Sequence, residues 1–354
     1  MRLAITGALG HIGSRFIHGL QPGDFDEVLL IDNLATQRYV SLFNLPGGVP
    51  FRFVETDILT ADLRMLLSGC DAVIHLAAIT NAAGSFENQE QVEKVNFEGT
   101  DRVAQACLAT GSRLVFLSTT SVYGTANEVV DESCSEADLK PQSPYALSKL
   151  RAERRLAELG ARQGLRFVAC RFGTIYGTSV GMRFHTAVNK FVWQACLGEP
   201  ITVWRTALHQ KRPYLDLGDA DRALKFILGR DLFDGQVYNL LTDNATVGEI
   251  VEIIRKYVPD LRVTFVDSQI MNQLSYTVAR EKFTARGFKF QGDLERGIRE
   301  TIELLRDVRS RADRAPAPEQ QADAEHQRVG GQGAQAPEQG RRDGRARPQG
   351  DSQK

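Results

Sequence analysis

The sequence predicts a doubly wound α/β fold, in which helices cover both faces of a parallel sheet, followed by a smaller lobe. Three observations indicate this class. Short apolar runs alternate with stretches of helical length through the first half of the chain. The runs are apolar at nearly every position, as strands buried on both faces require. A glycine-rich turn follows the first run and leads into a helical stretch, which is where folds of this class hold a nucleotide.

Each apolar run is predicted to form one buried strand. The runs cover residues 2–6, 27–32, 51–56, 72–78, 113–118 and 166–172. Apolar periodicity predicts long helices over 92–110 and 145–163. Ser143 and Pro144 suit the N-cap and first turn of the second helix. Strands that alternate with helices in this way favour parallel pairing.

After about Thr178 the alternation ends. Helices are predicted over 184–197, 246–258 and 293–309, and strands over 200–204 and 236–241. We therefore assign residues 1–177 to a dinucleotide-binding domain, which the chain re-enters near 213–230, and residues 178–311 to a substrate-binding lobe. Residues 312–354 are rich in Gln, Gly, Arg, Ala and Pro and are predicted to be a disordered tail, either dispensable or used for interaction.

Composition excludes several classes of function. The chain has 354 residues, 42% of them hydrophobic, and a formal net charge of −1, so nucleic acid or an anionic membrane is not expected as a partner. Five widely spaced cysteines without a CxxC pair favour reduced thiols over disulfides or a metal site. The chain carries no signal-peptide pattern or membrane-length apolar stretch, and a cytoplasmic location is expected.

The glycine turn reads GALGHIG and predicts a dinucleotide site. Gly7, Gly10 and Gly13 would allow a tight turn, close approach of the pyrophosphate, and tight packing of helix on strand. The predicted cofactor contacts here also include His11 and Ile12. At the end of the second strand, Asp32 would accept hydrogen bonds from the adenosine ribose and repel the 2′-phosphate of NADP, which favours NAD.

Other residues near the adenosine are open to a plainer interpretation. Asp32 and Asn33 could form only a turn after a strand. Asp57 and Ile58 could flank the adenine, although acidic residues often end strands without any ligand.

Two further motifs carry the predicted chemistry. SPYALSK places Tyr145 and Lys149 four residues apart on one helix face. FLSTTSVYG ends a strand in four hydroxyl side chains. With TGALGHIG, LLIDNL, HLAA, VNFEGT, RFGTIYG and RPYLDLGD, these motifs make residues 1–310 resemble the extended short-chain dehydrogenase/reductase superfamily, and within it the nucleotide-sugar epimerases and dehydratases.

The resemblance implies a Rossmann sheet, bound NAD and specific roles for residues. Tyr145 is implied as the acid/base, Lys149 as the group that tunes it and holds the nicotinamide ribose, and Thr119 as the hydroxyl that bonds the sugar oxygen and the phenol. The remaining implied cofactor contacts line the cleft: Ala77, Ala78, Asn96 and Ser118. Asn96 could instead be a helix cap. Relatives are commonly homodimers through two helices, which would here be 92–110 and 145–163.

The hydroxyl strand end favours one reaction of the family. Similar dehydratases carry an Asp-Glu pair after the threonine, and similar decarboxylases carry a Glu two residues after it, whereas this chain has Thr120 and Ser121. Hydroxyls suffice for hydride transfer with one proton shuttle, so the resemblance implies 4-epimerisation of a nucleotide-diphosphate sugar.

The implied substrate contacts are Thr120, Thr174, Asn189 and Arg212. Thr174 stands where the family often has Asn, and Arg212 matches an arginine that contacts the diphosphate. Other basic residues over 183–211, Arg183 among them, could bind a diphosphate near the cleft, but for each of them a solvated charge of the surface lobe is the favoured interpretation. His11 and His75 are read as packing or turn residues rather than acids.

Two alternatives remain open. The chain could be a reductase, or a dehydratase that uses acids from elsewhere, such as Glu128 or Asp131. It could also be a non-catalytic NAD-binding scaffold or sensor, although a sensor has no need of a Tyr-Lys-Thr proton shuttle.

Overall fold

A computed structural model describes residues 1–308 apart from 125–128, 268–274 and 306, and the structural statements below concern these residues. The predicted tail over 312–354 and the predicted acid Glu128 lie outside them. No helix of this part of the chain is long and apolar enough to cross a membrane.

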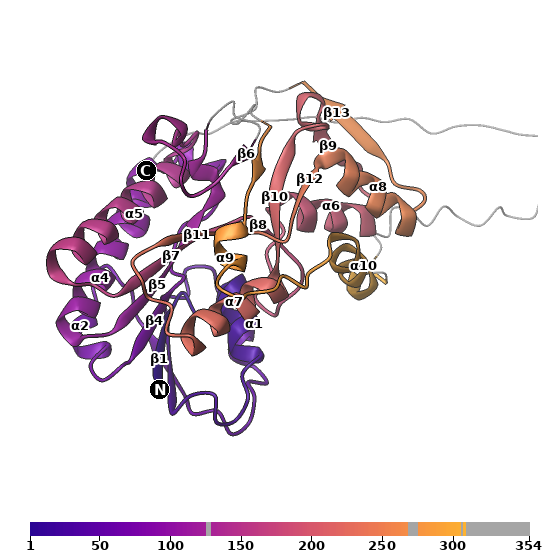
Figure 1. Ribbon diagram of the computed structural model, residues 1–354. Helices are drawn as coiled ribbons and strands as arrows, with labels where there is room; N and C mark the ends of the chain where they lie inside the picture. Colours follow the sequence, from indigo (N-terminus) through magenta and orange to yellow (C-terminus); the bar gives the residue numbers. More distant parts are fainter. Residues whose placement is uncertain (125–128, 268–274, 306, 309–354) are drawn as a thin grey trace, which may run out of the picture. The chain divides into compact units, whose positions relative to one another are not determined.

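The large sheet contains seven parallel strands in the order β11-β7-β5-β4-β1-β2-β3 (Figure 1). Its members are β1 (Arg2–Thr6), β2 (Glu27–Asp32), β3 (Phe51–Glu55), β4 (Ala72–His75), β5 (Arg113–Thr119), β7 (Phe167–Phe172) and β11 (Val237–Leu240). The six predicted strands are thus confirmed, and so is the predicted fold class. From β1 the chain proceeds to β2 and β3 on one side and to β4, β5 and β7 on the other. This reversal leaves a crevice at the carboxyl ends of the strands, where nucleotides bind.

Helices cover both faces of the sheet, as the continuously apolar strands predict. On one face, Leu3 and Ile5 share a core with residues of α1 (His11–His18) and α7 (Leu217–Gly229). On the other, Ala4 and Leu29 share a second core with residues of α4 (Gly99–Thr110) and α5 (Pro144–Gln163), and α2 (Leu63–Leu66) packs on α4. Alternate residues of one strand therefore serve two separate cores.

The helix predicted over 92–110 has an irregular middle. It consists of α3 (Gln89–Glu93), a π-helical turn, η3 (Lys94–Glu98), and α4. Helix α5 begins as predicted, with the Ser143 side chain accepting from the Ala146 amide and Pro144 in the first turn. A π-helical turn commonly marks a functional position.

The smaller lobe has its own core and short sheets. Strands β8 (Thr174–Tyr176), β10 (Lys211–Asp216) and β12 (Asp243–Thr246) form one sheet, β9 (Ile201–Trp204) pairs with β13 (Val263–Val266), and β6 (Val129–Val130) pairs with β14 (Thr277–Val278). The core of this lobe contains residues of α6 (Ala187–Cys196), α8 (Val247–Tyr257) and α10 (Leu294–Leu305). A short helix, α9 (Glu281–Thr284), packs beside β11.

One predicted strand belongs to a different sheet. The strand expected over 236–241 in the smaller lobe pairs in parallel with β7 and forms an edge of the large sheet. Its pattern identified a strand correctly, but strand pairing depends on partners far away in the sequence, which a local pattern does not reveal.

The remaining short helices connect the larger elements. They are η1 (Tyr39–Leu42), η2 (Gly84–Phe86), η4 (Thr120–Val122), η5 (Glu136–Asp138) and η6 (Arg205–Ala207). Four of the five cysteines are buried and Cys134 is partly exposed, all of them as free thiols.

Candidate active site

The glycine turn between β1 and α1 has the close approaches that its spacing predicts. Gly7 has φ +67°, and a Cβ there would lie 2.5 Å from the Ala77 amide nitrogen. A Cβ on Gly13 would lie 2.3 Å from the Ala8 carbonyl oxygen. Around Gly10 the nearest atom is the Gly7 carbonyl oxygen at 3.3 Å. The chain thus turns tightly against the segment after β4 at Gly7, packs tightly at Gly13, and is less crowded at Gly10.

His11 begins helix α1 directly after this turn. It is 5% exposed, its Nδ1 lies 2.7 Å from the Ser179 hydroxyl, and its Nε2 is buried without a partner among the described residues. Burial, together with the positive charges of Arg183 and Arg38, lowers the pKa of His11 to about 3. His11 is therefore neutral at physiological pH and is not an acid catalyst.

Asp32 at the end of β2 is tied to the glycine turn. Its carboxylate accepts from the Leu9 amide at 3.0 Å and from the Leu34 amide at 2.9 Å. Asn33 donates its side-chain amide to Asp57 at 3.0 Å, so the ends of β2 and β3 are joined. These contacts place the predicted adenosine residues at one edge of the crevice.

Ile58 and Asn96 frame the helical side of the crevice. Ile58 is buried against Gly99, where a Cβ would lie 2.8 Å from its Cδ1. Asn96 lies in the π-helical turn and is wholly buried. Its amide accepts from the Ile79 amide at 2.8 Å and donates to the Ile79 carbonyl at 2.9 Å and to Ser148 at 3.2 Å. Asn96 is therefore not a helix cap; it fixes the segment after β4 that contains Ala77 and Ala78.

Tyr145 and Thr119 meet at the carboxyl end of β5. Burial raises the pKa of Tyr145 above its ordinary value, while the Arg183 guanidinium and a hydrogen bond with Thr119 act in the opposite direction. The Thr119 hydroxyl also accepts from the Ser121 amide at 3.1 Å. The nearby cation that favours the phenolate is Arg183, a residue that the sequence places among solvated surface charges.

Lys149 lies one turn after Tyr145 and is 3% exposed. Burial lowers the pKa of Lys149 to about 7, and the Glu153 carboxylate opposes this shift. Its ammonium group lies 4.8 Å from the centre of the Phe116 ring, and no carboxylate of the described residues lies within ion-pair distance. A buried cation without a counter-ion is suited to a ligand that brings hydroxyl groups or negative charge.

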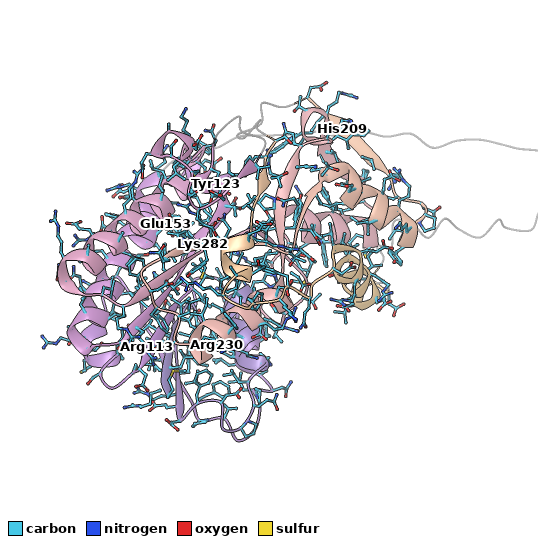
Figure 2. All side chains as sticks on the ribbon, in the orientation of Figure 1. Arg113, Tyr123, Glu153, His209, Arg230 and Lys282 are labelled. Carbon is cyan, nitrogen blue, oxygen red and sulfur yellow. The ribbon has the colours of Figure 1, made fainter. Side chains whose placement is uncertain are left out.

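Beneath Lys149 lies a buried polar network that sequence reasoning missed. Arg171 of β7 pairs with Glu153 of α5 at 2.6 Å, and the side chain of each is 5% exposed. Arg171 also donates to the Tyr123 hydroxyl at 2.9 Å, and Figure 2 labels Tyr123 and Glu153. Ser118, a predicted cofactor contact, donates to Glu153. Two features of the sequence could have revealed this network. Glu153 lies about two helical turns after Tyr145, and Arg171 interrupts an apolar strand.

The hydroxyl strand end forms part of the floor of the crevice. Thr120 is 3% exposed and donates to the Phe172 carbonyl at 3.3 Å. Its own carbonyl accepts from the Tyr276 hydroxyl at 3.3 Å. Asp131, offered above as an alternative acid, accepts from the Ser133 amide at 2.8 Å and from the Ser133 hydroxyl at 2.6 Å, and these bonds lower its pKa.

The predicted substrate contacts have different surroundings. Thr174 begins β8 and is partly exposed. Arg212 in β10 donates to Gln210 at 2.9 Å, lies over the Tyr276 ring, and burial lowers its pKa. Asn189 is wholly buried in α6, and its side chain bonds the backbone of Gly177 and Arg183. These bonds occupy both ends of the Asn189 amide, and a contact with substrate stays a prediction for all three residues.

His75 is a packing residue, as expected. It is wholly buried in β4, with Nδ1 2.7 Å from Thr6 Oγ1 and Nε2 3.0 Å from Thr100 Oγ1. Burial and then the Lys149 charge lower the pKa of His75 to about 3.

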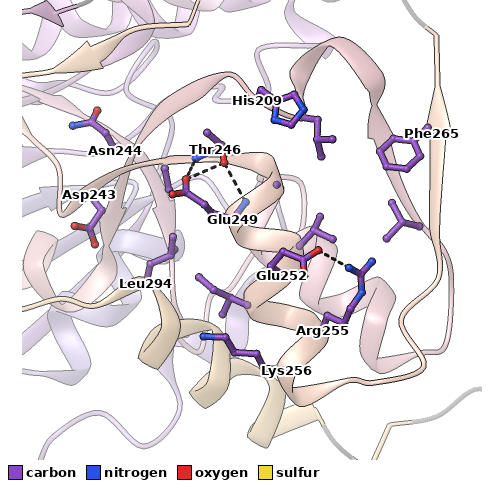
Figure 3. A pocket seen from close by; sticks show the side chains of 16 residues that line it. His209, Asp243, Asn244, Thr246, Glu249, Glu252, Arg255, Lys256, Phe265 and Leu294 are labelled. Carbon is purple, nitrogen blue, oxygen red and sulfur yellow. Dashed lines mark hydrogen bonds and ion pairs between the residues drawn. The ribbon is translucent and has the colours of Figure 1, made fainter.

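A cavity of about 830 Å³ lies in the smaller lobe, beside α8 and strands β12 and β13 (Figure 3). Its wall includes Glu252 and Arg255, which pair with each other, and His209. None of the predicted site residues lines this cavity, so it is not part of the candidate site.

These features agree with the comparisons with known proteins. A family model described as NAD dependent epimerase/dehydratase family matches residues 3–240. The uncharacterized UDP-glucose epimerase YtcB of Bacillus subtilis is 31% identical over 72% of this chain and 81% of its own length. The trifunctional UDP-glucose 4,6-dehydratase/UDP-4-keto-6-deoxy-D-glucose 3,5-epimerase/UDP-4-keto-L-rhamnose-reductase RHM3 of Arabidopsis thaliana is 29% identical over 85% of this chain, a match that spans 46% of that protein.

Among solved structures, UDP-glucuronic acid 4-epimerase from Bacillus cereus in complex with UDP-glucuronic acid and NAD is similar, with a TM-score of 0.77. The identity is 25%, and the match covers 86% of this chain and 99% of that one. The relatives thus include both epimerases and dehydratases of nucleotide sugars.

Proposed function

The chain belongs to the NAD-dependent epimerase/dehydratase family, and we propose that within it the chain is a nucleotide-sugar epimerase that inverts carbon 4 through a transient keto-sugar. The observation that carries the proposal is the polar environment of Tyr145. Thr119 ends β5 and is followed by Thr120 and Ser121, so hydroxyl side chains stand where similar dehydratases carry an Asp-Glu pair. Loss of water from a sugar needs an acid at this position, whereas proton exchange with one hydroxyl does not.

The residues of the crevice fit NAD, the cofactor of this family. The glycine turn leaves the amides at the start of α1 available to a pyrophosphate. Asp32 and Asn33 would face the adenosine ribose, with Asp57 and Ile58 at the adenine. Lys149 would hold the nicotinamide ribose, beside Ala77, Ala78, Asn96 and Ser118. When bound, NAD accepts and returns a hydride.

The chain's own residues supply orientation and proton transfer. The Tyr145 phenolate would take the proton from the sugar hydroxyl and, once the keto-sugar has turned its opposite face to the cofactor, return it to the same oxygen. Thr119 would orient the sugar oxygen and the phenol by hydrogen bonds. The ammonium of Lys149 and the guanidinium of Arg183 would stabilise the phenolate, because nearby positive charge favours the ionised form of a phenol.

The other contacts would hold the sugar nucleotide. Thr120 and Thr174 would face the sugar and Arg212 would pair with the diphosphate, which a planar guanidinium binds through two parallel bonds. Asn189 would act there chiefly by shaping the loop that precedes α6. A homodimer through the helices over 89–110 and 144–163 belongs to the same proposal.

The test is mass spectrometry of the protein's cofactor and products. The purified chain is incubated in deuterated water with UDP-, GDP- and dTDP-sugars, beside a Tyr145→Phe variant. For the wild type we expect bound NAD and an epimer that has gained no deuterium on carbon. The Tyr145→Phe variant should still contain NAD but react about 10²–10⁴-fold more slowly.

Other products would contradict the proposal in identifiable ways. A product lighter by one water would indicate a dehydratase that uses acids outside the hydroxyl strand end. Net consumption of NADH or NADPH would indicate a reductase. Bound NAD without turnover of any sugar would favour a scaffold or sensor.

A further inference from the structure

The loop between β8 and α6 is fastened to the glycine turn of the other lobe. The Ser179 hydroxyl lies 2.7 Å from His11 Nδ1 and accepts from the Ser14 hydroxyl at 3.0 Å. The Gly181 amide donates to the same Ser14 hydroxyl at 2.9 Å. We call residues 178–185 the strap. The strap therefore crosses the start of helix α1, where a pyrophosphate would bind.

Gly181 is the point of closest contact between the strap and the glycine turn. A Cβ at Gly181 would lie 2.6 Å from the Leu9 carbonyl oxygen, 2.8 Å from Ser14 Oγ and 2.9 Å from Ser41 Oγ. Contacts under 3.0 Å with backbone cannot be relieved without movement, so only glycine lets the strap lie this close. Asn189 holds the far end of the strap by accepting from the Gly177 amide and donating to the Arg183 carbonyl.

The strap delivers an arginine into the crevice. Arg183 is partly buried, bonds Thr80 just after β4, and influences both His11 and Tyr145 electrostatically. Its loop is held against the glycine turn through Ser179 and Gly181, and its guanidinium donates to Thr80 in the segment after β4. The guanidinium therefore lies near the path that a dinucleotide would span. Its Nε is buried and lacks a hydrogen-bond partner in the described part of the chain.

Positive charge predominates around Arg183 in the described part of the chain. Arg38, which follows β2, influences Arg183 and His11, and neither arginine has a carboxylate within ion-pair distance among the described residues. The carboxylate that acts on Arg38 is Asp32. The buried, unpartnered Nε2 of His11 faces the same charges. Partly buried guanidinium groups in this state bind an anion with two ionised oxygens.

We propose that Arg183, carried by the strap, clamps the diphosphate of the bound dinucleotide. This rests on the proposed placement of NAD in the crevice. The clamp comes from the lobe that also contains Asn189 and Arg212, two of the predicted substrate contacts. Release of the cofactor therefore requires the strap to lift, and NAD stays bound between turnovers.

The test measures cofactor affinity directly. NAD is removed from the full-length chain, and binding of NAD, ADP-ribose and adenosine is measured by calorimetry at two salt concentrations. In Arg183→Met we expect binding of NAD and ADP-ribose to weaken about 10- to 100-fold, with a smaller salt dependence, and binding of adenosine to stay within twofold. The affinity of the Arg183→Lys variant for NAD should lie between the affinities of Arg183→Met and the wild type.

Two further variants control the result. Arg255→Gln removes a charge from α8, in the same lobe but outside the crevice, and should leave NAD affinity unchanged. Gly181→Ala keeps Arg183 but displaces the strap, and should speed NAD release about tenfold or more, since it undoes the same charge-assisted contact. Thermal unfolding of each variant checks that it is folded.

The possible failures are distinguishable. If the wild-type chain binds no NAD, both the proposed function and the proposed clamp are wrong. A wild-type chain that binds NAD, with Arg183→Met binding NAD and ADP-ribose equally well, would overturn the clamp alone. Loss of affinity only for sugar nucleotides with an acidic sugar would also overturn it, because Arg183 would then bind the substrate.

Discussion

At the scale of single residues, Lys149 shows what burial does to the charge of an amine. Its pKa is lowered to about 7 in the folded protein, against about 10.4 in an unfolded chain. Between these values the unfolded state binds more protons than the folded state. The free energy of unfolding therefore rises with pH from about 7 to about 10, by at most about 1.4 kcal/mol per pH unit for this group.

Lys149→Met should abolish this rise. Urea unfolding of NAD-free protein at several pH values between 6.5 and 9.5, for the wild type and the variant, gives the difference that belongs to Lys149. We expect the variant to gain stability over the wild type at the acidic end and to lose that advantage toward pH 9.5. A difference independent of pH would mean that Lys149 keeps an ordinary pKa.

At the scale of elements, helix α1 depends on contact with the turn before it. Gly13→Ala would place a Cβ 2.3 Å from the Ala8 carbonyl oxygen, so α1 would have to move away from β1. We expect destabilisation of about 1–3 kcal/mol and a clear loss of NAD affinity, measured by urea unfolding and calorimetry. Gly229→Ala at the end of α7 meets nothing within 4 Å and should be neutral or slightly stabilising. Equal behaviour of the two variants would contradict this account of the turn.

The Arg171–Glu153 pair joins β7 to α5 under the active site. Arg171→Met leaves Glu153 buried without its partner, which is expected to cost about 3–5 kcal/mol. The double variant Arg171→Met/Glu153→Leu removes both charges and should be more stable than Arg171→Met alone. Denaturant unfolding of both variants tests this. If the double variant loses as much stability as the two single substitutions together, the two residues act independently.

At the scale of the whole molecule, the proposed clamp would make the cofactor a link between two lobes. NAD should slow hydrogen exchange at the backbone amides of residues 7–13 and also of residues 178–185, because both sides of the diphosphate become ordered. Mass spectrometry of peptides from the protein with and without NAD measures this. Protection confined to residues 7–13 would contradict the link.

Much of this molecule could be predicted from its sequence because the relevant signals are local. Continuous apolar runs identified the strands, and glycine spacing identified the turn at Gly7. Contacts between distant segments could not be predicted. The partner of β11 lies in β7, far back in the chain, and Arg183 resembles any surface charge until Gly181 brings its loop against α1. Glu153 likewise joins the candidate site through Arg171 and Ser118, which lie on two strands distant in the sequence.

The π-helical turn over Lys94–Glu98 corresponds to one residue inserted into an otherwise regular helix. Deleting Lys94 would let α3 and α4 join as an ordinary helix that still packs on the sheet. Asn96 would then rotate by about 100° around the helix axis, away from Ile79 and the segment after β4. We therefore expect this shortening to disturb the segment around Ala77 and Ala78, which Asn96 fixes, more than it disturbs the fold.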